Sequence, residues 1–115
     1  MVRKLNLAVC AACMAAAIAA PGAEAALRSC GPVVNPYAGT RFEGSNLHHI
    51  RARHVTCPGA RTVAKGAHRK ALAMTPTLSG IRRFTWRGWR VLGDLRGSDD
   101  RYLAVRGHRR VRWRF

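Results

Sequence analysis

Arginine alternates with apolar residues at the end of the sequence, and this spacing suits anion binding. Arg110, Arg112 and Arg114 are separated by Val111 and Trp113. Guanidinium groups form paired hydrogen bonds to phosphate or carboxylate groups. The segment is either a basic tail or a β-strand, and only a strand places its arginines on one side.

Other residues that do chemistry are few after residue 25. The acidic ones are Glu43, Asp94, Asp99 and Asp100. They show no acid–base pair, and the sequence has no nucleophile-elbow or phosphate-loop motif. A Cys57 thiol with His54 as its base is an alternative, but a Cys30–Cys57 disulfide competes with it. We therefore expect no enzyme and no cofactor.

Three histidines lie close together in the sequence, at His48, His49 and His54. Neighbouring residues on a strand point to opposite faces, so His48 and His49 cannot bind one ion unless the strand is broken there. Zinc also needs further ligands. We expect surface histidines and no metal site.

The first 25 residues have the pattern of a signal peptide. "MVRK" is a positive start, "LNLAVCAACMAAAIAA" is apolar, and "AEA" is a small-x-small cleavage site. A membrane anchor is the alternative, but the run is short and mostly alanine. A lipidated Cys10 or Cys13 is another. We expect an exported or envelope-associated protein with one mature domain over 26–115 and no transmembrane segment.

Removal of the leader leaves two cysteines, Cys30 and Cys57. Export places them in oxidising surroundings. A disulfide between them contributes roughly 3 to 4 kcal/mol in the chain-entropy model, whereas free thiols are the alternative. Removing Arg3, Lys4 and Glu24 from 21 basic and five acidic residues leaves 19 against four, a net charge of +15. Nucleic acid, anionic glycans and acidic lipid are candidate partners. A GC-rich coding sequence also produces many arginines without selection for a ligand.

Local patterns predict the elements that must position the arginines. Residues 27–46 are rich in glycine, proline and asparagine and suit an irregular segment. A short strand is expected within 47–57. Thr56 as a cap and Pro58 in the first turn begin a helix over 57–70. Its small apolar face must pack against bulky residues elsewhere, and it consists of Ala60, Val63, Ala64 and Ala67.

Two turns fix the register of the C-terminal third. A type II′ turn at Gly107 and His108 pairs residues whose numbers sum to 215, and a turn through "RGSDD" pairs those that sum to 195. Val91 then lies beside Ala104. One face collects Trp89, Val91, Tyr102, Ala104, Val111, Trp113 and Phe115. The other collects Arg90, Leu92, Asp94, Arg101, Leu103, Val105, Arg110, Arg112 and Arg114.

This segregation favours a three-stranded meander over a tail. We predict an α+β fold in two layers, with one helix on the aromatic face of a small antiparallel sheet. An exposed stacking platform for single-stranded nucleic acid is the alternative use of the tryptophans, and Trp86 lies outside the paired region. The arginine face either binds anions, is solvated, or is covered by residues 31–44.

The layout resembles a family of small exported proteins of uncharacterised function from actinobacterial-type genomes. The motifs that carry the resemblance are "I-x-A-x-x-V-T-C-x-x-A-R-x-V-A" at 50–64 and "G-W-x-V" at 88–91. Members commonly have a second cysteine pair, and Val91 and Ala104 stand at the matching positions. The resemblance implies the fold but no activity.

We expect a non-enzymatic module that binds anionic polymers or surfaces through its sheet. The expected anion-binding residues are Arg90, Arg101, Arg110, Arg112 and Arg114. A membrane-active, toxin-like effector and a small enzyme or enzyme inhibitor are the alternatives. The sequence leaves the ligand and the oligomeric state open.

Overall fold

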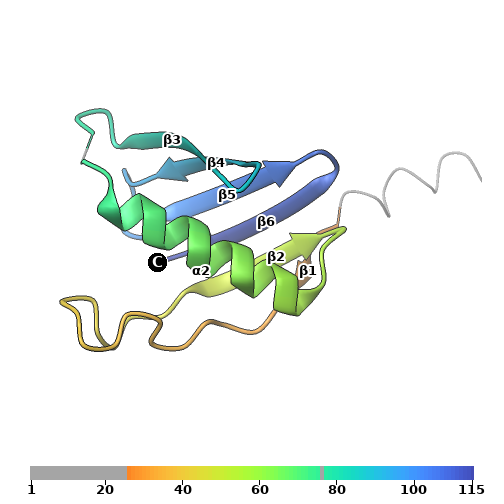
Figure 1. The fold of residues 1–115 in the computed structure, drawn as a ribbon, viewed down its shortest axis with the longest axis horizontal. Helices are drawn as coiled ribbons and strands as arrows, with labels where there is room; N and C mark the ends of the chain where they lie inside the picture. The colour runs from red at the N-terminus through yellow and green to blue at the C-terminus, as the bar shows by residue number, and fades with distance from the viewer. Residues whose placement is uncertain (1–25, 76) are drawn as a thin grey trace, which may run out of the picture.

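The computed structural model describes residues 26–75 and 77–115, which place one helix on one face of a six-stranded antiparallel sheet (Figure 1). The elements are β1 (Arg28–Ser29), β2 (His48–Arg53), α2 (Cys57–Ala73), β3 (Ile81–Trp86), β4 (Trp89–Asp94), β5 (Arg101–Arg106) and β6 (Arg109–Arg114). The strand order in the sheet is β1-β2-β6-β5-β4-β3. The predicted α+β class with two layers is confirmed. The expected leader, residues 1–25, lies outside the described residues.

The C-terminal meander has the predicted register. Ala104 pairs with both Val111 and Val91, and Tyr102 pairs with Trp113. Gly107 has a φ of 59°, while His108 is not in the left-handed region, as a type II′ turn requires. Since side chains alternate along each strand, this register places the aromatic residues toward α2 and the arginines on the opposite face.

The sheet is wider than the predicted meander, because β3 pairs with β4 along its whole length and β2 pairs with β6. Strand β3 was not predicted from the sequence. Its inward-facing positions are Arg82, Phe84 and Trp86, and Arg82 is buried. An arginine at a core position hides the apolar alternation by which a strand is recognised.

Helix α2 begins as expected and extends three residues beyond the predicted end. The Thr56 hydroxyl accepts a hydrogen bond from the backbone N–H of Gly59, and Pro58 lies in the first turn. The predicted stripe of small residues is buried, and His68 and Ala71 continue it. The last turn forms because Ala71 is buried in the same core.

Aromatic side chains supply the bulk that the small helix face lacks. The Trp86 ring lies against Gly66, where an added Cβ would come within 2.0 Å of the indole. Tyr102 and Trp113 stack with ring centroids 5.3 Å apart, and Trp113 is buried. The predicted core is confirmed, and Trp86 belongs to its margin.

The N-terminal segment is held at the helix side of the molecule. Cys30 and Cys57 form the predicted disulfide, which joins the end of β1 to the first turn of α2. Farther along, the Tyr37 ring contacts His68 of the helix and Phe115. Residues 31–44 therefore pack toward the aromatic face, and none of them lines a hollow on the arginine face.

Candidate anion-binding face

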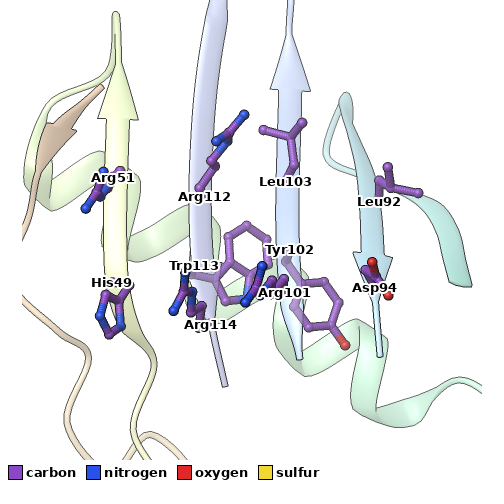
Figure 2. Close-up of a pocket in the computed structure, with 10 residues that line it drawn as sticks. All are labelled: His49, Arg51, Leu92, Asp94, Arg101, Tyr102, Leu103, Arg112, Trp113 and Arg114. Carbon is purple, nitrogen blue, oxygen red and sulfur yellow. The ribbon is translucent and has the colours of Figure 1, made fainter. Parts of the chain in front are cut away.

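The face of the sheet opposite α2 presents arginines in rows that run across the strands. One row of directly paired residues joins Arg51 of β2, Arg112 of β6, Leu103 of β5 and Leu92 of β4. Figure 2 shows these four side chains crossing the sheet in that order. A neighbouring row consists of His48, Arg114, Arg101 and Asp94. We call this surface the arginine face.

A hollow of about 350 Å³ lies in the arginine face. Trp113 and Tyr102 border it from behind the sheet (Figure 2). The side chains that line it from the arginine face are His49, Arg51, Leu92, Asp94, Arg101, Leu103, Arg112 and Arg114. Four arginines thus surround two leucines.

The five arginines that the sequence suggested for anion binding lie at three different places in the structure. Arg101, Arg112 and Arg114 line this first hollow. Arg90 lines a second hollow on the same face. Arg110 lines neither, and its Nη1 donates hydrogen bonds to the carbonyl oxygens of Gly107 and Arg109, at 2.7 and 3.1 Å. Only three of the five therefore converge.

The positive charges in the first hollow are balanced by few acidic side chains. Of the described residues that line it, Asp94 alone is acidic. Its carboxylate is held by Arg96, 3.0 Å from the guanidinium Nε, and these hydrogen bonds lower the pKa of Asp94 to about 2. Asp94 is therefore ionised but already bound to a side chain outside the hollow.

Three pairs of arginines are direct cross-strand neighbours on this face: Arg51 with Arg112, Arg53 with Arg110, and Arg101 with Arg114. The first and the third of these pairs line the first hollow. Like charges directly opposite each other destabilise a sheet. An anion between the guanidinium groups would remove that repulsion and accept their hydrogen bonds. The arrangement is chemically suited to hold phosphate, sulfate or carboxylate groups.

The contributions of β2 to the hollow were not predicted from the sequence. Arg51 reaches the hollow because β2 lies beside β6, a pairing that no local pattern indicates. His49 reaches it because the register shifts between His48 and Arg51 and His49 has a φ of 52°. The sequence predicted that His48 and His49 diverge unless the strand is broken there. The structure meets that exception, because the bulge brings their Nδ1 atoms within 2.6 Å.

The structure also bears on the three other roles that the sequence raised: a reactive thiol, a metal site and a stacking platform. The disulfide consumes the Cys57 thiol that a pairing with His54 would require. Among residues 26–75 and 77–115, no three His, Cys, Asp or Glu side chains are grouped so that they could hold a metal ion. Trp89 and Trp113 are buried, so they offer no open stacking platform.

A separate polar cluster lies inside the core, beneath the sheet. The Tyr37 hydroxyl is 2.5 Å from Nδ1 of His68, whose side chain is fully buried. Burial raises the pKa of Tyr37 to about 12. Burial, aided by the charge of Arg82, lowers the pKa of His68 to about 4. The imidazole is therefore neutral at pH 7, and it shares a hydrogen bond with the Tyr37 hydroxyl.

Comparison with known proteins adds no further constraint: no protein-family model, curated protein or solved structure matches the chain. Within the part of the chain that the structure describes, no helix combines the length and the apolar character needed to cross a membrane.

Proposed function

We propose that this protein is an exported, non-enzymatic module that binds anionic polymers or surfaces of the cell envelope through its arginine face. The observation that carries the proposal is the convergence of Arg101, Arg112 and Arg114 with Arg51 around one hollow. Their only described acidic neighbour in the hollow, Asp94, is already bound to Arg96.

The arrangement of charge supports binding over simple solubility. A solvated basic surface lowers its self-repulsion by spacing its arginines or pairing them with carboxylates. Here Arg51 and Arg112 are instead direct cross-strand partners, as are Arg101 and Arg114. Such adjacency costs stability, and an anionic ligand recovers that cost. Export is supported by the leader-like first 25 residues and by the disulfide.

The test is retention of the oxidised protein on polyphosphate and sulfated-glycan matrices across a salt series. Binding that releases counterions weakens steeply between about 50 and 200 mM salt. The triple variant Arg101→Gln, Arg112→Gln, Arg114→Gln is expected to elute at much lower salt than the parent protein.

A matched control removes three charges elsewhere. Lys65→Gln, Arg69→Gln and Arg109→Gln are exposed positions off the arginine face, so the two triple variants have equal net charge. Retention of the control close to that of the parent supports the proposal. Equal loss in both variants, or retention that does not depend on salt, would refute it.

A further inference from the structure

One cross-strand row of the arginine face has charge at both ends and leucine in the middle. It extends from Arg51 and Arg112 through Leu103 and Leu92 to Arg83 of β3. Arg51, Arg112 and Arg83 are exposed, and Leu92 keeps 37% of its surface open to solvent. The row therefore offers an aliphatic floor between two cationic ends.

The hollows of the surface follow the same row. The first, of about 350 Å³, contains Arg51 and Arg112. The second, of about 470 Å³, contains Arg83 and Arg90. Both are lined by Leu92 and Leu103, so they adjoin at the leucines, and we call the two hollows together the groove. Val105 widens the aliphatic part of the second hollow.

Strand spacing sets the separation of the two cationic ends. Arg112 on β6 and Arg83 on β3 are three strands apart in the sheet order. At about 4.8 Å for each neighbouring pair, their backbones are separated by about 14 Å. One compact anion cannot contact both ends, whereas a linear molecule with two charged groups can.

We propose, on the basis of the anion-binding function above, that the groove takes a linear ligand with anionic groups separated by about 10 to 15 Å of uncharged, largely aliphatic chain. One phosphate or carboxylate group lies among Arg51, Arg112 and Arg114. The spacer crosses Leu103 and Leu92, and the next anionic group reaches Arg83 and Arg90. The ligand is thus an extended polyanion whose repeat alternates charge and neutral chain.

A ligand of this kind would contact both cationic ends and the leucines between them, whereas other kinds of anion would contact only some of these groups. A densely charged polyanion would gain nothing from an aliphatic floor. A single-headed amphiphile would gain nothing from arginines at the second end, where its tail would lie. An alternating ligand uses both cationic ends and the leucines, and engagement of the second end raises affinity through effective concentration.

Three small probes separate these possibilities by calorimetry or fluorescence with the oxidised protein. Decane-bisphosphonate has two anionic groups at about the required separation, ethane-bisphosphonate has the same groups close together, and decylphosphonate has the aliphatic chain with one group. Decane-bisphosphonate is expected to bind about tenfold more tightly than either of the others. Decylphosphonate is used below its aggregation concentration.

Variants locate the second contact. Arg83→Gln is expected to weaken decane-bisphosphonate about tenfold, to the level of decylphosphonate, and to change ethane-bisphosphonate by less than about twofold. Leu92→Thr is expected to weaken the binding of decane-bisphosphonate and of decylphosphonate, and to leave the affinity for ethane-bisphosphonate nearly unchanged. Arg69→Gln on α2 and Leu78→Thr in the α2–β3 connection are the matched controls, and both positions are exposed.

Several outcomes would overturn the inference. They are equal affinity for the long and short bisphosphonates, equal affinity for decane-bisphosphonate and decylphosphonate, an equal effect of Arg83→Gln on all probes, and no binding of any probe. These outcomes are distinct from failure of the proposed function, which is decided by salt-dependent retention and the Arg101, Arg112 and Arg114 variants.

Discussion

His68 is a titratable side chain enclosed by aromatic and cationic neighbours. Its ring lies 4.3 Å from the Phe115 ring centroid and 5.2 Å from that of Tyr102. The Arg82 guanidinium, which donates to the Ala71 carbonyl, adds a positive charge nearby. A protonated imidazole is disfavoured here, because it would lose water and face like charge.

We expect stability to fall in acid because of His68. The unfolded imidazole binds a proton at a pKa near 6.5, whereas in the folded protein the pKa is about 4. The contribution of neutral His68 is therefore complete above pH 6.5 and is lost as pH falls from 6.5 to about 4. The difference corresponds to about 3 kcal/mol. Urea unfolding at a series of pH values measures it.

The histidine variants assign this pH dependence. His68→Gln is expected to flatten the fall between pH 6.5 and 4. His108→Gln, at an exposed turn position, is expected to keep it. A parent protein with constant stability over that range would contradict the assignment, as would a His68→Gln variant with an unchanged slope.

Gly66 is a second residue whose role depends on a close contact. Gly66→Ala improves helix propensity by about 1 kcal/mol, but the new Cβ would lie 2.0 Å from Cζ2 of Trp86. We expect net destabilisation of about 1 to 3 kcal/mol because the indole must shift. In a Trp86→Val background the same change is expected to stabilise. A stabilising effect in the parent would contradict this account, and denaturant unfolding of the four proteins measures the coupling.

At the scale of elements, the outer strands of the sheet are protected from pairing with other chains. Lys70 of α2 donates to the Thr85 carbonyl of β3, at 2.6 Å, and the Thr77 hydroxyl donates to the Ile81 carbonyl. At the other edge β1 has only two residues. Short or occupied edges limit sheet extension.

The meander register makes a covalent test possible. Val91 and Ala104 are cross-strand partners on β4 and β5, at the positions where similar proteins were expected to have cysteines. Val91→Cys with Ala104→Cys is expected to form a disulfide and to stabilise the fold by about 2 to 4 kcal/mol. Intact mass and thermal unfolding measure both effects. Leu92→Cys with Ala104→Cys, on opposite faces, should form no intramolecular bridge, and a bridge there would show that the register is wrong.

At the scale of the whole molecule, a small core supports a large positive charge. The chain has 21 basic and five acidic residues, and the salt bridge between Arg96 and Asp94 offsets only one of the positive charges near the arginine face. Repulsion among the arginines opposes folding. The disulfide counters this repulsion by restricting the unfolded chain between residues 30 and 57.

Loss of the disulfide should therefore be costly. Cys30→Ser with Cys57→Ser is expected to lower the free energy of unfolding by roughly 3 to 4 kcal/mol. Reductant should have the same effect on the parent and none on the variant. Guanidinium unfolding with and without reductant is the measurement, and a loss below about 1 kcal/mol would show that the core suffices without the bridge.

Features that depend on local periodicity could be predicted from the amino-acid sequence. The alternation in residues 89–114 and the Gly107 turn specify which residues pair and which face they occupy, because side chains alternate strictly along a strand. The spacing of Ala60, Val63 and Ala64 specifies the buried face of α2. For the same reason, the sequence pattern alone assigns Arg112 and Arg114 to one face of the sheet.

Which arginines meet depends instead on long-range packing in the folded molecule. Arg51 lies beside Arg112, which comes 61 residues later in the chain, because β2 pairs with β6. Arg110 lines neither hollow, because its guanidinium donates hydrogen bonds to carbonyl oxygens of its own hairpin turn. The second end of the groove exists because β3 pairs with β4, although buried Arg82 conceals that strand in the sequence. These contacts depend on how segments that are distant in the sequence pack together. Such packing produces no local periodicity in the sequence from which it could be predicted.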